Sequence, residues 1–169
     1  MRPRLCIDLK KFHHNGEKLC EMAAKAGLDQ LAFVTKSFCA LPEMVEALED
    51  LPNPYLADSR VENLANYPET KKQKILLRLP MLSQCEKVVK YADISFCSEP
   101  DILTALDREA GRQGKEHKVV LMVDMGDLRE GVDNIPELVE LAQLCESLPH
   151  LRLQGVGTNH ACMNGVLPS

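Results

Sequence analysis

The sequence predicts an α/β fold built on parallel strands, and three observations support this. Short apolar runs rich in β-branched and aromatic residues recur along the 169 residues, and the run at 119–123 is the clearest. Such runs are typical of parallel strands that are buried on both faces. Segments with helical periodicity alternate with these runs, and the connections between them are short. This alternation indicates βαβ units.

The first half of the chain opens with a strand expected at residues 5–9 and a helix from Lys10 to Ala26. Gly27 is the residue expected to end that helix. The next elements, in chain order, are a strand at 31–35, a helix at 42–50, a strand at 55–58, a helix that Ser59 opens in an S-x-x-E capping pattern, and a strand at 75–79.

The second half repeats the same rhythm. Its expected elements are a helix that Ser83 opens in a second S-x-x-E pattern, a strand at 94–97, a helix capped from Ser98, a strand at 119–124, a loop to Ile135, a helix around 138–144 and a strand at 153–158. The alternation from residue 31 onwards therefore contains about six strands. A complete (β/α)8 barrel takes roughly 250 residues, whereas a doubly wound sheet accommodates six strands, so the strand count alone leaves both folds open.

Composition excludes several classes of function. A net charge of −5 argues against nucleic acid or an anionic membrane as the main partner. No apolar run approaches the ~20 residues of a membrane span, and a secretory signal is not expected. The seven cysteines are scattered without a C-x-x-C pair, which indicates reduced thiols in a cytoplasmic protein and no zinc site.

Polar residues follow each expected strand and favour the barrel, because the carboxyl ends of all barrel strands meet at one mouth. These residues are Lys36, Asp58, Arg78, Ser98, Asp124 to Arg129, and Thr158 to His160. Ser98 is explained as a helix cap, and Asp58 could serve the start of the next helix. Arg78 lies inside a strand expected to be buried, where a guanidinium needs a partner, and this favours a functional role.

Lys36 and Arg129 are the strongest candidates for chemistry. A lysine at the end of a strand can form a Schiff base with an aldehyde if partial burial favours the neutral amine. The alternative is a side chain that simply reaches solvent. Arg129 lies between Gly126 and Gly131, so a tight loop could direct it over the mouth. Its default role is also solvent exposure.

Several motifs resemble the alanine-racemase-like family of fold-type III pyridoxal-phosphate enzymes, in the family's order and across the whole chain. They are Ile7 to Lys11, Val34-Thr35-Lys36, Met122 to Gly131, and Gly155 to Ala161. Three variants are most similar to the ornithine-racemase-like branch, namely Ala57 to Arg60, Leu77 to Met81, and Gly157-Thr158-Asn159 with Cys162.

The resemblance implies a (β/α)8 barrel of the TIM type, present as an incomplete barrel of about six βα units. Residues 1–169 would be the N-terminal part of a pyridoxal-phosphate-binding barrel domain, truncated before the last strands of a longer protein. Lys36 would carry the cofactor as a Schiff base and act as a catalytic base. Arg129 would lie beside the cofactor and the substrate carboxylate, and the implied cofactor-binding set is Lys36, Arg78, Arg129, Thr158 and Asn159.

Three departures from alanine racemases argue against alanine as the substrate. Ala40 stands where they have a tyrosine, Met122 where some carry a modified lysine, and Asn159 where a histidine stacks on the cofactor ring. The resemblance therefore implies a racemase that acts on ornithine or another basic amino acid, in a homodimer of the full-length protein.

The second acid or base of such a racemase is open, with Cys39 and Cys162 as candidates. One alternative function is a non-catalytic pyridoxal-phosphate carrier of the same superfamily. Another is a doubly wound domain in which Lys36 is incidental.

Overall fold

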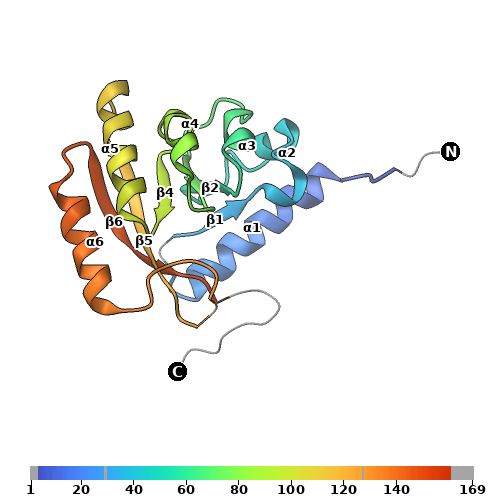
Figure 1. Ribbon diagram of the computed structural model, residues 1–169. Helices are drawn as coiled ribbons and strands as arrows, with labels where there is room; N and C mark the ends of the chain where they lie inside the picture. The colour runs from blue at the N-terminus through green and yellow to red at the C-terminus, as the bar shows by residue number, and fades with distance from the viewer. Residues whose placement is uncertain (1–3, 29, 127, 161–169) are drawn as a thin grey trace. The chain divides into compact units, whose positions relative to one another are not determined.

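The computed structural model describes residues 4–28, 30–126 and 128–160 (Figure 1). The chain divides into two compact units, residues 1–74 and residues 75–169. None of the helices within the described ranges combines the length and apolar character that a membrane span requires.

The first unit contains three helices, two strands and the start of a third strand. Its elements are α1 (Leu9–Lys25), β1 (Ala32–Val34), the 3-10 turn η1 (Lys36–Phe38), α2 (Pro42–Glu46), β2 (Tyr55–Asp58) and α3 (Val61–Ala65). β1 and β2 pair in parallel, with Val34 opposite Ala57. The strand predicted at 55–58 is confirmed at those residues.

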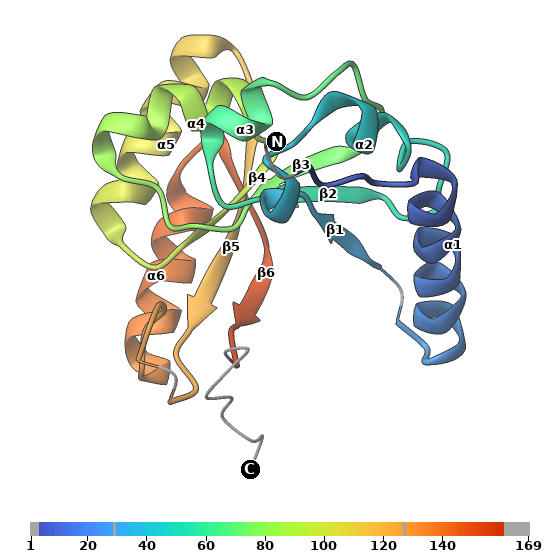
Figure 2. The same cartoon turned by 90° about the vertical axis from the view of Figure 1, so that its right-hand side faces the viewer.

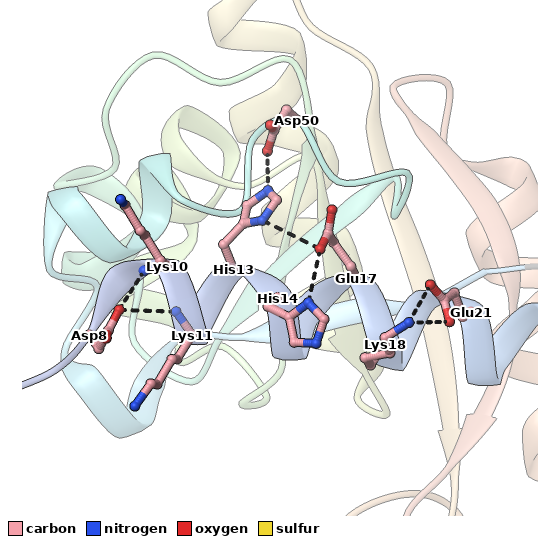
Figure 3. A network of polar contacts seen from close by, with 9 residues as sticks. All are labelled: Asp8, Lys10, Lys11, His13, His14, Glu17, Lys18, Glu21 and Asp50. Atoms are coloured by element: carbon pink, nitrogen blue, oxygen red, sulfur yellow. Dashed lines mark hydrogen bonds and ion pairs between the residues drawn. The ribbon is translucent and has the colours of Figure 1, made fainter.

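Residues 4–8 have no regular secondary structure and α1 begins at Leu9, so the strand predicted at 5–9 is wrong. Asp8 is the N-cap of α1, and its carboxylate accepts hydrogen bonds of 3.0 and 3.1 Å from the backbone amides of Lys10 and Lys11 (Figure 3). An acidic N-cap satisfies amides that otherwise lack a partner at a helix start. Further along α1, His13 Nε2 lies 2.9 Å from Asp50 Oδ1, which joins the helix to the segment before β2 (Figure 3).

The inner face of α1 leaves out some of the helix's apolar residues. Leu19 and Met22 are exposed, whereas Gly16 is buried. A Cβ at Gly16 would lie 2.5 Å from Leu51 Cδ1, so the missing side chain lets the helix approach the core closely. That core consists of Ala40, Val45, Leu48, Leu51 and Leu56, with Phe12, Cys20, Phe33, Phe38 and Tyr67 packed against it.

The second unit continues the alternation of strands and helices. Its elements are the end of β3 (Gln73–Leu76), the 3-10 turn η2 (Leu82–Gln84), α4 (Cys85–Tyr91), β4 (Ile94–Cys97), α5 (Pro100–Gln113), β5 (His117–Val123), α6 (Ile135–Ser147) and β6 (Leu151–Thr158). The strands pair in parallel, with Ile75 opposite Ile94 and Met122 opposite Gly157. Helices α5 and α6 pack against β5 and β6 (Figure 2).

The strand order decides the fold class. Strands that neighbour one another in the sheet are also neighbours in the chain, from β1 to β6. A doubly wound sheet instead reverses its order at a switch point. The fold is therefore of the α/β-barrel type, present as six parallel strands with alternating helices.

Several element ends differ from the predicted ones. The serines expected to cap α3, α4 and α5 do not take the N-cap positions, which are occupied by Arg60, Gln84 and Glu99. The strand predicted at 75–79 runs over Gln73–Leu76 instead. The helix predicted to reach Asp50 ends at Glu46.

Candidate functional site

Lys36 lies directly after β1, as the first residue of the turn η1. Its position at the carboxyl end of a parallel strand is the one predicted. The expected partial burial is not observed, because the side chain of Lys36 is exposed and Val34 before it is 40% exposed. Lys36 is therefore a primary amine presented to solvent at a strand end.

The turn after Lys36 has an unusual backbone. Cys39 and Ala40 have φ angles of +52° and +53°, in the left-handed region that non-glycine residues rarely adopt. The carbonyl of Thr35 accepts hydrogen bonds from the amides of Phe38, at 3.1 Å, and Ala40, at 3.3 Å. Ala40 is also buried in the core of the first unit. These contacts hold Lys36 at the head of a tight turn.

A buried carboxylate lies at the end of β2, the strand beside Lys36's own strand. Asp58 is fully buried, and its Oδ2 accepts a 2.6 Å hydrogen bond from the Thr35 hydroxyl. Its Oδ1 accepts from the backbone amide of Arg60, at 2.9 Å, and from the side-chain amide of Asn63, at 3.0 Å. The prediction that Asp58 serves the start of the next helix is confirmed, and its contact with Thr35 was not predicted.

Tyr67 adds a third side chain to the hydrogen-bonded pair of Thr35 and Asp58. Its hydroxyl lies 2.7 Å from Thr35 Oγ1. Burial, together with the nearby charge of Asp58, raises the pKa of the Tyr67 phenol to about 12 even though the hydrogen bond to Thr35 acts in the opposite direction. Tyr67 is therefore a neutral hydrogen-bond donor at physiological pH.

Arg78 lies in a bend after β3 and its side chain is exposed. The reason given for a functional role, a guanidinium inside a buried strand, is therefore wrong. Its role in cofactor binding stays a prediction.

The loop after β5 is shaped by Asp124 and two glycines. Asp124 Oδ1 accepts hydrogen bonds from the amides of Gly126, at 2.8 Å, and Leu128, at 3.1 Å. The loop returns to β5 where Val132 N donates to the Met122 carbonyl at 3.0 Å. Arg129 is exposed near the middle of this loop, and its role in ligand binding stays a prediction.

Thr158 and Asn159 lie at the end of β6, beside the loop that carries Arg129. Thr158 is exposed and pairs in register with Val123, the last residue of β5. The side-chain amide of Asn159 donates a 2.9 Å hydrogen bond to Glu130 Oε1. The second unit thus brings together three of the predicted site residues, Arg129, Thr158 and Asn159, at the carboxyl ends of two paired strands.

Of the two cysteines named as candidates for a second acid or base, Cys39 is exposed three residues after Lys36. Cys162 lies outside the described residues. Within the described ranges, no group of three or more His, Cys, Asp or Glu side chains is arranged to hold a metal ion.

A sequence profile described as "Alanine racemase, N-terminal domain" matches residues 7–167. The chain belongs to this family. Its predicted membership is confirmed.

Two curated relatives are amino-acid racemases. The chain is 40% identical over 168 residues to "Ornithine racemase" of Acetoanaerobium sticklandii, which covers 99% of this chain and 47% of the relative. It is 34% identical over 169 residues to "Lysine racemase" of Thermotoga maritima, with 99% and 46% covered. The chain therefore spans about half the length of the curated relatives that it matches.

The fold has a solved counterpart in the alanine racemase of Clostridium difficile 630. The TM-score is 0.73 at 20% identity, over 90% of this chain and 40% of that one. This similarity supports the barrel-type fold of the alanine racemase N-terminal family.

Proposed function

We propose that the protein is a pyridoxal-phosphate-dependent racemase of a basic amino acid, ornithine or lysine. The observation that carries the proposal is an exposed Lys36 amine at the carboxyl end of β1, in a chain 40% identical to an ornithine racemase over 99% of its length. The second relative, a lysine racemase, supports the same substrate class.

In this proposal residues 1–169 form the N-terminal part of a barrel domain, and the complete protein works as a homodimer in the cytoplasm. Lys36 would hold the cofactor covalently through its amine, which the turn η1 presents at the carboxyl end of β1. Pyridoxal phosphate, when bound, acts as an electron sink that acidifies the α-hydrogen of an amino acid.

The residues of this chain would then bind the substrate and move its proton. Lys36 would take up or return the α-proton on one face. Arg129, exposed between the glycines of its loop, would bind a carboxylate through its planar fork of donors. Arg78, Thr158 and Asn159 would contribute further polar contacts to the cofactor, and Cys39 is a candidate for the opposite face.

Covalent trapping tests the role of Lys36. Pyridoxal phosphate and borohydride should fix the cofactor to the peptide that contains Lys36 in the complete protein. Lys36→Arg keeps the positive charge and removes the primary amine, so it should abolish the adduct. Lys25→Arg, at the end of α1, is the matched control and should leave the adduct intact. An adduct of wild-type yield in Lys36→Arg would exclude Lys36 as the attachment site.

Hydrogen exchange at the α-carbon tests the reaction. Incubation of the complete protein with ornithine, lysine, alanine and histidine in deuterium oxide should label ornithine or lysine fastest. Labelling confined to alanine would contradict the proposed substrate class. Trapping at Lys36 without labelling of any amino acid would instead favour a pyridoxal-phosphate carrier.

A further inference from the structure

A hydrogen-bonded chain of three side chains, the buried Thr35 and Asp58 and the partly buried Tyr67, includes the residue immediately before Lys36. The hydroxyl of Thr35 is 2.6 Å from Asp58 Oδ2 and 2.7 Å from the Tyr67 hydroxyl. Thr35 and Asp58 are both fully buried. These residues come from the end of β1, the end of β2 and the segment after α3.

The direction of the hydrogen bonds follows from the chemistry of the groups. The Thr35 hydroxyl donates to Asp58 Oδ2 at 2.6 Å and also lies 3.3 Å from the Ala57 carbonyl, so its single proton is directed to these acceptors. Tyr67 must then donate its own proton to Thr35 Oγ1, and its raised pKa keeps that proton in place. The chain therefore runs from Tyr67 through Thr35 to Asp58.

The backbone of Thr35 is held as firmly as its side chain. Its amide donates to the Ala57 carbonyl at 2.8 Å. Its carbonyl accepts from the amides of Phe38 and Ala40 in the turn that follows. Every polar group of Thr35 is thus engaged, and Lys36 is the next residue.

Stability alone is a poor reason for this arrangement. A carboxylate without solvent is costly to bury, and apolar residues of similar size often fill such a position at no loss of stability. Polar networks that are fully satisfied hold one geometry in preference to others. Here the network fixes the geometry of Thr35, the residue before Lys36, to which the cofactor is proposed to attach.

We propose that Asp58, Thr35 and Tyr67 are positioning residues that fix the turn from which the Lys36 amine reaches the cofactor. This inference rests on the proposed role of Lys36. The three side chains act through the backbone of Thr35: Asp58 and Tyr67 hold its hydroxyl between two strands, and its carbonyl holds the turn. A loss of the hydroxyl should therefore slow attachment at Lys36 even in a folded protein.

The experiment compares four variants of the complete protein with wild type. Thr35→Val removes the hydroxyl at constant shape, and Thr35→Ser restores it. Tyr67→Phe removes only the outer donor and keeps the contact between Thr35 and Asp58. Thr104→Val removes an exposed threonine hydroxyl in α5 and is the matched control.

The readout is the rate of borohydride-trapped attachment of pyridoxal phosphate to the Lys36 peptide, measured across pH, with thermal unfolding in parallel. Thr35→Val should react about tenfold more slowly than wild type, which corresponds to a barrier raised by ~1.4 kcal/mol. Tyr67→Phe should be slowed less, and Thr35→Ser and Thr104→Val should react like wild type.

Two results would overturn the inference while leaving the proposed function intact. One is a Thr35→Val protein that unfolds at a lower temperature yet reacts at the wild-type rate, because the network would then only stabilise the fold. The other result applies if Thr35→Val does not fold. A wild-type rate of attachment in Tyr67→Phe would then also show that the network only stabilises the fold. If pyridoxal phosphate does not attach to Lys36 in the wild-type protein, both the proposed function and this inference are wrong.

Discussion

The side-chain amide of Asn159 donates a 2.9 Å hydrogen bond to Glu130 Oε1, which ties the end of β6 to the loop after β5. Glu130 is the neighbour of Arg129 in that loop. Asn159 therefore has a structural contact within the chain itself. The side-chain amide of Asn159 holds the loop after β5 from the end of β6.

Asn159→Asp should loosen this loop, because a second carboxylate would face Glu130 in place of a donor. We expect a loss of about 1 kcal/mol in the free energy of unfolding, together with faster hydrogen exchange at the amides of Gly126 and Leu128. Gln154→Glu adds the same charge at an exposed position of β6 and is the control. Unchanged exchange in Asn159→Asp would show that the contact does not order the loop.

Gly131 is required where the loop returns to β5. Its φ angle is +113°, and a Cβ there would lie 2.6 Å from Asp124 N and from the carbonyl carbon of Val123. Backbone atoms cannot move aside as a flexible side chain can. Gly131→Ala should therefore lower the free energy of unfolding by about 2–3 kcal/mol.

Gly114 provides the matched control for that substitution. Its φ is also positive, at +64°, but nothing lies within 4 Å of a Cβ added there. Gly114→Ala should carry only the conformational cost of the left-handed region, about 1 kcal/mol. Equal losses in the two variants, measured by denaturant unfolding, would contradict a steric role for Gly131.

His117 makes stability depend on pH. It is buried at the start of β5, with Nε2 2.9 Å from the Ser95 hydroxyl. Burial lowers its pKa from 6.5 to about 4, against the opposing charge of Asp93 and with a smaller contribution from Lys115. The unfolded chain therefore takes up a proton near pH 6.5, and the folded protein does so only near pH 4.

Stability should consequently fall as the pH is lowered through this window. We expect a loss of about 2 kcal/mol between about pH 7 and pH 5 from this group. His117→Gln can keep a contact with Ser95 but does not titrate, so its unfolding free energy should change less over the same range. The same slope in the variant, measured by urea unfolding, would assign the pH dependence to other groups.

The sequence predicted the strands from residue 31 onwards and the position of Lys36, because both follow from local patterns. The apolar runs give the strand positions, and the lysine follows one of them directly. The helix predicted from Lys10 to Ala26 is confirmed as α1 (Leu9–Lys25). The strand at 5–9 was predicted wrongly since Leu5 to Leu9 alternates like a strand, although Asp8 is a good N-cap. The alternating apolar pattern favours a strand in this segment and Asp8 favours the start of a helix. The structure has the helix start.

The buried polar contacts could not be predicted, because they depend on residues that are distant in the chain. Asp58 and Thr35 are 23 residues apart, and only the pairing of β1 and β2 brings them together. Lys72 is a second case: its ammonium is buried and donates to the carbonyls of Leu51 and Asn53 at 2.6 and 2.7 Å. Burial lowers the pKa of this lysine. The left-handed Cys39 was equally hidden, since no glycine marks it.

Arg129 is predicted to serve ligand binding and to contribute little to folding. It is exposed in the loop between Gly126 and Gly131, outside the apolar pattern of β5 and α6. Arg129→Ala should change the free energy of unfolding by no more than ~0.5 kcal/mol, as at ordinary surface positions. It should weaken binding of pyridoxal phosphate or of the amino acid about tenfold or more, since a charge-assisted hydrogen bond contributes ~1.5–3 kcal/mol.

Arg108 in α5, with 75% of its side chain exposed, is the matched control, and Arg108→Ala should alter neither stability nor ligand binding. Arg129→Lys separates charge from shape, because an ammonium cannot form the paired hydrogen bonds of a guanidinium. Binding in Arg129→Lys should therefore remain below that of wild type when both are measured by absorption titration with pyridoxal phosphate and by the KM for ornithine. Normal binding and KM together with a large loss of stability in Arg129→Ala would instead make this arginine a structural residue of the loop.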